Sequence, residues 1–272
     1  VILGQAGIFH MGHAAFYAVG AYVTAILNTM FHWSIFWTMP VAGFAAALVA
    51  LVVARPIIHL RGDYLLIVTI GIVEIVRIAL TNDIGGITGG SNGIFGIARP
   101  RFFGFRIVKS IQFYYLVWGM CGATILLFHC LWHSRIGRAL NYIKEDDVAA
   151  EACGVNVTHY KLMAFVLGAF WAGMAGTLYA AKMTTIAPAS FNFMESVIIF
   201  AVVILAGGSQ LGVLVSAFLF IGLPELLRGF SSARMLFFGA AMMIMMVWRP
   251  QGLMPPRQRR YRIPDPGTEE RS

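Results

Sequence analysis

Charged residues are scarce in this sequence of 272 residues: Asp, Glu, Lys and Arg make up only 12%, whereas hydrophobic residues make up 59%. Soluble globular domains carry roughly twice that charged fraction, so the composition argues against an ordinary soluble domain and favours a membrane protein. Cysteine is scarce as well. The three cysteines, Cys121, Cys130 and Cys153, lack the spacing of metal ligands, and we interpret them as small apolar packing residues.

Catalytic and nucleotide-binding motifs are also missing. The sequence has no Walker-type phosphate loop, no HExxH and no nucleophile paired with a base, which predicts no catalysis by this chain, no metal and no cofactor. Nucleic acid is disfavoured as a partner despite the net charge of +8, because six of the twenty basic residues lie at or beyond Arg249. A basic flank beside the last apolar segment is instead typical of a membrane-topology signal.

Long apolar runs are abundant. A spanning helix needs roughly 20 mostly apolar residues, and the period-two alternation of an outer-membrane barrel is absent, which leaves helices as the spanning elements. We predict an all-α, polytopic transmembrane bundle over residues 1–248, with seven or eight membrane elements, and a basic cytoplasmic tail over 249–272. The apolar runs cover 8–31, 34–54, 64–80, 111–133, 162–181, 195–207, 211–228 and 233–248.

Two features limit the count of elements. Residues 195–207 are short enough to be half of a broken helix rather than a full crossing. Val1 stands in an apolar context without an initiating Met, so we expect further residues to precede it in the natural chain, and their number and any helices they form are not given by this sequence.

The distribution of Lys and Arg predicts the orientation, because basic residues favour the cytoplasmic side. With the tail inside, the loop 55–63, the segment 134–161 and the tail hold twelve of the twenty basic residues, against seven outside. The loop 81–110 then lies outside. Its glycines oppose a helix, and we interpret it as a flexible surface loop or a contact for a binding protein.

A polar segment, residues 134–160, interrupts the apolar runs. It holds four of the twelve acidic residues, and the sequence from Glu145 to Gly154 predicts a short helix that begins with acidic residues and ends at glycine. Val148, Ala149 and Ala152 would give this helix one small apolar face. Two interpretations remain open from the residues alone: an ordinary solvated loop, or a helix that docks into a cytoplasmic partner.

Six stretches, in order along the chain, resemble the LivM-type permeases of branched-chain amino acid ABC transporters. They are "GQAGIFHMGHAAFYAVGAY" (4–22), "LRGDYLLIVTIGIVEIVR" (60–77), "TGGSNGI" (88–94), "RALNYIKEDDVAAEACGVNVTHYKLMAFVLGAFWAGMAG" (138–176), "LAGGSQLGVL" (205–214) and "WRPQGL" (248–253). The resemblance implies a bacterial inner-membrane importer that contains a second homologous permease, two cytoplasmic ATP-binding subunits and a periplasmic substrate-binding protein.

The same resemblance implies that residues 141–160 carry the coupling helix that presses into an ATPase. The residues expected to contribute are Glu145, Asp146, Asp147, Ala150, Glu151 and Gly154. The stretch "AAEACG" departs from the fuller EAA-type signature of other ABC importers, which affects the individual contacts.

Polar residues inside apolar runs are candidates for the substrate pathway, because they usually face the bundle interior. Gln5, His10 and His13 lie among glycines that favour a break in a membrane helix, although a hydrogen-bonded packing role is the alternative for the histidines. Glu74 and Arg77 have a spacing that also allows a structural ion pair. Gly207 and Gly208, in "AGGSQLG", mark a second break or a tight turn.

Small residues in 168–177 predict close helix packing. Gly168, Ala172 and Gly176 form one row, and Ala169, Gly173 and Thr177 form a parallel row. The leading functional hypothesis is thus an importer subunit for branched-chain amino acids. The alternatives are a relative that carries urea, short amides or other amino acids, and a self-sufficient carrier or channel; a membrane-embedded enzyme is disfavoured.

Overall fold

The computed structural model describes residues 2–222 except 61, 103–104 and 108, together with the single positions 239, 243 and 247. Apart from those three positions, the predicted span 233–248 and the predicted tail 249–272 lie outside the described residues. The described part falls into two compact units that divide after Val203. Each unit is described by itself.

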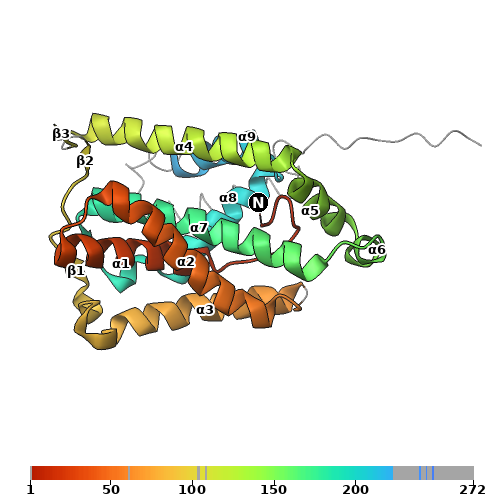
Figure 1. The fold of residues 1–272 in the computed structure, drawn as a ribbon, viewed down its shortest axis with the longest axis horizontal. Coiled ribbons are helices and arrows are strands. Elements are labelled where there is room, and N and C mark those ends of the chain that lie inside the picture. The colour runs from red at the N-terminus through yellow and green to blue at the C-terminus, as the bar shows by residue number, and fades with distance from the viewer. Residues whose placement is uncertain are drawn as a thin grey trace, which may run out of the picture. The chain divides into compact units, whose positions relative to one another are not determined.

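Helices dominate the first unit, as predicted (Figure 1). Its helices are α1 (His13–Phe31), α2 (Ile35–Ile57), α3 (Asp63–Thr81), α4 (Ser110–His133), α5 (Arg135–Glu145), α6 (Asp147–Ala152), α7 (Val157–Met183) and most of α8 (Phe193–Ala206), with short 3₁₀ turns η1 (Ile84–Gly86), η2 (Gly90–Asn92) and η3 (Pro188–Ser190). Among the residues that the structure describes, six segments are long and apolar enough to cross a membrane: α1, α2, α3, α4, α7 and Pro188–Ala206. The short run 195–207 therefore forms the end of a segment of spanning length.

The N-terminal glycines lie in non-helical backbone ahead of the first helix. The apolar run predicted to begin at residue 8 becomes helical only at His13; residues 2–6 form turns, and residues 7–12 have no regular secondary structure. Gly7 has a φ of 65°, a conformation that glycine adopts without the steric cost of a Cβ.

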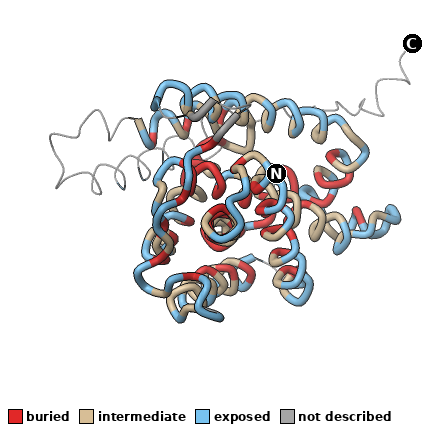
Figure 2. Tube along the Cα trace, turned by 60° about the vertical axis from the view of Figure 1, so that its left-hand side comes forward, coloured by how far each residue is buried: buried red, intermediate tan, exposed pale blue. Residues whose placement is uncertain are grey.

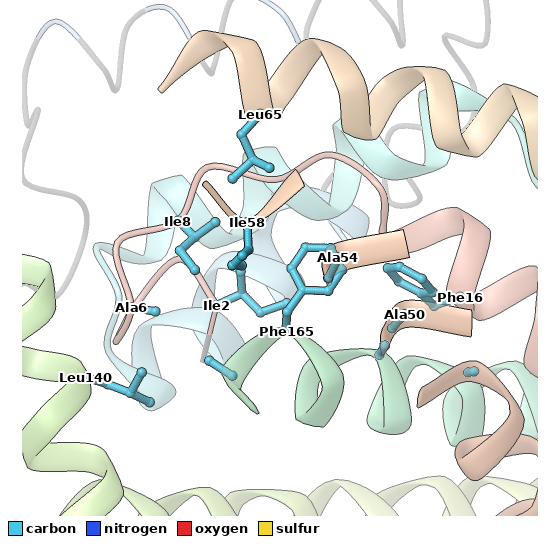
Figure 3. Close-up of a cluster of buried hydrophobic side chains, with 13 residues drawn as sticks. Ile2, Ala6, Ile8, Phe16, Ala50, Ala54, Ile58, Leu65, Leu140 and Phe165 are labelled. Carbon is cyan, nitrogen blue, oxygen red and sulfur yellow. The ribbon is translucent and has the colours of Figure 1, made fainter. Parts of the chain in front are cut away.

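Helices α1, α2 and α7 pack together around the interior of the first unit, where the buried residues gather in Figure 2. Figure 3 shows one buried cluster, in which side chains of the N-terminal loop meet the ends of these helices. Phe16 of α1 and Phe165 of α7 are both fully buried there, with ring centroids 5.6 Å apart. The loop before α1 is therefore part of the core rather than a surface tail.

Small residues bring these three helices into close contact, as the sequence rows predicted. A Cβ at Gly173 would lie 2.6 Å from the Ala46 Cβ and 2.7 Å from the Ala42 carbonyl oxygen. A Cβ at Gly20 would overlap the backbone of Gly173, and one at Gly176 would overlap the carbonyl oxygen of Tyr17. Glycine at these positions is what allows the backbones of α1, α2 and α7 to approach each other.

Replacing Gly173 with alanine should therefore destabilise the bundle by about 1–3 kcal/mol, the usual cost of overpacking. Gly119→Ala is the matched control, because a Cβ at Gly119 of α4 meets nothing within 4 Å. The thermal unfolding midpoint of the detergent-purified chain measures both variants. Equal midpoints for the two would contradict the close approach of α2 and α7.

Short strands join the loop regions at the far end of α7 from α6 (Figure 1). β1 (Ile94–Phe95) pairs antiparallel with β4 (Thr185–Ile186), which follows α7, and β2 (Arg101–Phe102) pairs with β3 (Phe105–Arg106). The Asp83 side chain accepts hydrogen bonds from the backbone of Thr88 and Gly89. The glycine-rich loop, predicted as a flexible surface loop or a contact for a binding protein, has turns at Asp83 and a strand contact with β4.

The second unit contains a turn at Gly207 and Gly208, the helix α9 (Gln210–Ala217) and a π-helical turn, η4 (Phe218–Gly222). Gly207 and Gly208 have φ values of 70° and 84°, and the Ser209 side chain caps α9 by accepting from Gly212 N. The sequence motif "AGGSQLG" therefore forms a turn between two helices, while the rest of the predicted span 211–228 lies outside the described residues.

Candidate functional site

The polar segment folds into two helices rather than the single one predicted. Glu145 ends α5, and Asp146 has an extended backbone with φ −155° and ψ 114°. Its side chain accepts hydrogen bonds from Val148 N at 2.8 Å and Ala149 N at 3.1 Å, which is the geometry of a helix N-cap. The capping preference of aspartate explains why α6 starts at Asp147.

Glycine ends α6 as predicted. Gly154 has a φ of 82°, and Val155 N donates to the Ala150 carbonyl at 3.1 Å, so the last carbonyls of this short helix are satisfied. The helix is therefore fixed at both ends by its own sequence.

One side of α6 is exposed and the other holds it to the bundle. The predicted apolar face is open: Val148 is 64% exposed, and Ala149 and Ala152 are exposed as well. Ala150 is 4% exposed, and Asp147 forms an ion pair of 2.5 Å with Lys161 of α7. Ala150 and Asp147, expected as contact residues for a partner, thus face inward, whereas Glu145, Asp146, Glu151 and Gly154 are exposed.

A cavity of about 370 Å³ lies beside the junction of α5 and α6. Its walls come from the N-terminal loop, the α2–α3 connection, the α5–α6 junction and Lys161. Loop 55–63 and the segment 134–161, both predicted to be cytoplasmic, thus border the same cavity. Within it, Lys144 of α5 donates a hydrogen bond of 2.9 Å from Nζ to the Gly4 carbonyl, 140 positions away in the sequence.

The three polar residues predicted near the N-terminus lie on this loop and at the start of α1. Gln5 is 2% exposed, and its side-chain oxygen has no hydrogen-bond partner in the described structure. His10 is 6% exposed and packs against Phe165, with ring centroids 4.6 Å apart. His10 Nε2 and His13 Nδ1 are 2.9 Å apart and share a hydrogen bond.

The other predicted polar residues lie elsewhere. Glu74 and Arg77 pair with each other on α3 at 2.7 Å, with both side chains more than one third exposed, so the structural ion pair is the arrangement present. Gly207 and Gly208 belong to the second unit, in the turn after α8.

Sequence reasoning missed two residues. Ser196, only 1% exposed, accepts a hydrogen bond of 3.0 Å from Ala14 N, 182 positions away. Lys144 was counted only as a cytoplasmic charge. Neither has a local sequence signal, because each contact depends on how distant segments pack.

These features are those of a multi-pass membrane permease with a helix exposed at one end of its bundle. The chain belongs to the family described as the permease component of the branched-chain amino acid transport system, which matches residues 1–246. The resemblance inferred from the six sequence stretches is confirmed.

The similar proteins of known name are permeases of the same transport system. The chain is 40% identical over 281 residues to the high-affinity branched-chain amino acid transport system permease protein LivM of Salmonella typhimurium, and 39% identical to LivM of Escherichia coli. Both matches cover 94% of this chain and 65% of the relative, so the chain spans about two thirds of their length. The permease protein LivH of Escherichia coli is 26% identical over 249 residues, covering 84% of this chain and 78% of LivH. No solved structure matches the chain.

Proposed function

We propose that this chain is the membrane permease subunit of an ATP-driven importer of branched-chain amino acids in a bacterial inner membrane. The observation that carries the proposal is α6: a helix capped by Asp146, held by the Asp147–Lys161 ion pair, and open on its small apolar face. The 40% identity to a branched-chain amino acid permease supports the substrate class.

The remaining components are proposed from the family. Two cytoplasmic ATP-binding subunits hydrolyse ATP, a second homologous permease completes the path, and a periplasmic binding protein delivers the amino acid. The chain itself catalyses no reaction. In this arrangement residues 134–160 form the cytoplasmic coupling segment, residues 81–110 face the binding protein, and residues 249–272 form a cytoplasmic tail. The similarity to both LivM and LivH supports a pair of related permeases.

The mechanism follows from the contacts of α6. Closure of the ATPases displaces α6, and the ion pair of Asp147 with Lys161 transfers the displacement to α7. The α5–α6 junction moves with it, and the Lys144 hydrogen bond connects that junction to the N-terminal loop. ATPase closure at one end of the bundle thereby displaces the N-terminal loop, which carries the buried polar residues of the bundle interior.

Reconstitution into vesicles tests the proposal. We expect ATP-dependent leucine uptake only when the chain is combined with the second permease, the ATPases and the binding protein. Vesicles that lack the ATPases are the matched control. Full-rate uptake by the chain alone would show a self-sufficient carrier or channel, and uptake of urea or short amides in place of leucine would reassign the substrate class.

A further inference from the structure

A second, smaller cavity lies deeper in the first unit, between the N-terminal loop, the start of α1 and the first turns of α8. Its volume is about 60 Å³, which is room for a group the size of two water molecules, each about 30 Å³ in the liquid. Two of its polar lining residues are His13 of α1 and Ser196 of α8. Phe200 of α8 also lines the cavity and packs against Phe9 of the N-terminal loop, with ring centroids 6.3 Å apart.

The hydrogen bonds around the histidines fix their tautomers. Gly12 N donates to His10 Nδ1 at 3.0 Å, so this nitrogen carries no proton and His10 is neutral, with its proton on Nε2. That proton is donated to His13 Nδ1. The His13 Nδ1 therefore acts as an acceptor, and His13 carries its own proton on Nε2.

The His13 Nε2–H group has no acceptor among the described residues. His13 is the first residue of α1 and lines the cavity, so this donor is available at the positive end of a helix of 19 residues.

Ser196 supplies a second donor. Its oxygen already accepts from Ala14 N, and no acceptor for its hydroxyl proton occurs among the described hydrogen bonds, although the side chain is only 1% exposed. A buried hydroxyl usually has its proton hydrogen-bonded. His13 and Ser196 therefore present two unmatched donors to one cavity.

The rest of the lining is hydrocarbon apart from His10, whose two ring nitrogens are already used. The remaining lining side chains provide no acceptor and no charge; they are Ile2, Leu3, Ile8, Ile199, Phe200 and Val203. Two neutral donors at a helix N-terminus match a planar group with two acceptor oxygens and a negative charge. The apolar walls suit the hydrocarbon that such a group would bring.

We propose that this cavity is a subsite for the carboxylate group of the transported amino acid, with His13 Nε2 and Ser196 Oγ as its hydrogen-bond donors. The inference rests on the proposed function. Its volume admits the carboxylate and not the whole amino acid, so the side chain and the ammonium group lie outside it. The site favours a carboxylate over an amide, because the amide nitrogen would direct its own protons at a donor.

The test is leucine uptake by the complete reconstituted importer. We expect Ser196→Ala to raise the KM for leucine about tenfold or more, as the loss of a hydrogen bond to a charged group predicts. His13→Phe should act in the same direction, and His13→Gln, which keeps an N–H group, should retain more of the affinity. Thr24→Val, which removes a buried hydroxyl that bonds Gly20 O and Thr177 outside the cavity, is the matched control and should leave the KM unchanged.

Ser196→Cys provides a measurement that does not depend on transport. In a background with Cys121, Cys130 and Cys153 replaced by serine, leucine should slow alkylation of the new thiol in the assembled complex, and leucinamide should not. Co-purified ATPase subunits verify assembly for every variant. This measurement decides the proposal if the alanine variant does not fold.

The possible results are distinct. An unchanged KM in both the Ser196 and His13 variants, or alkylation that leucine does not slow, would overturn the subsite and leave a cavity for ordered water only. If the wild-type assembly transports no carboxylate-bearing solute, the proposed function itself fails, and the subsite with it. If the wild-type assembly transports leucine and the Ser196 and His13 variants keep the wild-type KM, only the subsite is ruled out and the proposed function stands.

Discussion

Replacing Ala149 with arginine should abolish ATP-driven uptake while the membrane bundle remains folded. Ala149 is exposed on α6 between Val148 and Ala152, and these small side chains leave a smooth face against which a partner can pack closely. A long charged side chain at the centre of an interface prevents this approach and is left desolvated, at a cost of several kcal/mol. We expect at least about a 100-fold loss of uptake, which corresponds to about 2.8 kcal/mol.

The experiment compares co-purification of the ATPase subunits, uptake in vesicles and the unfolding midpoint. Ala98→Arg is the matched control, because Ala98 is also exposed but follows β1, at the end of α7 remote from α6. The control should retain the ATPases. If the Ala149→Arg variant co-purifies with the ATPases as the wild type does, α6 is not part of the docking surface. A lowered unfolding midpoint would show that the substitution damages the bundle instead.

Replacing Lys144 with methionine should separate ATP hydrolysis from transport. The Lys144 ammonium group donates a hydrogen bond to the carbonyl of Gly4. Gly7 packs beside the same side chain, since a Cβ added at Gly7 would lie 3.1 Å from Lys144 Cγ. Methionine keeps the length and helix preference of lysine but cannot donate. Because a coupling contact typically contributes 0.5–2 kcal/mol, we expect uptake to fall between about twofold and 30-fold while the ATPases remain bound and active.

Lys144→Arg is the matched control, since arginine also donates to a carbonyl and should retain most of the uptake. The diagnostic quantity is the number of ATP molecules hydrolysed per leucine transported. An unchanged ratio for Lys144→Met would show that α5 does not act on the N-terminal loop through this contact. A parallel loss of ATPase binding would place Lys144 in the docking surface.

The spans were predictable because their signal is local. Apolar runs longer than about 20 residues leave few alternatives to a membrane helix, and the observed bounds of α2, α3 and α4 lie within three residues of the predicted ones. The small-residue rows in α7 predicted close packing for the same reason. The start of α1 was predicted less accurately, because residues 8–12 belong to the apolar run but are not helical.

The polar sites were only partly predictable. The sequence located the acidic segment and the N-terminal histidines, but it did not indicate that Asp146 would divide the segment or that Ala150 would face inward. Ser196 lies in a hydrophobic stretch without a motif, and its role depends on a hydrogen bond to α1 across 182 positions. Contacts between residues so far apart in the sequence depend on tertiary packing, and no short stretch of sequence indicates them.

The length of helix α7 connects the attachment point of α6 with the strand that pairs with the glycine-rich loop. Its 27 residues extend about 40 Å at 1.5 Å per residue, with the Lys161 attachment of α6 near its beginning and strand β4, paired with β1, just after its end. In the proposed assembly, a binding protein on the glycine-rich loop and the ATPases on α6 would therefore both act on α7, one at each end of the helix. One continuous helix would then connect the two proposed docking surfaces, with the Asp147–Lys161 ion pair as the attachment at the α6 end.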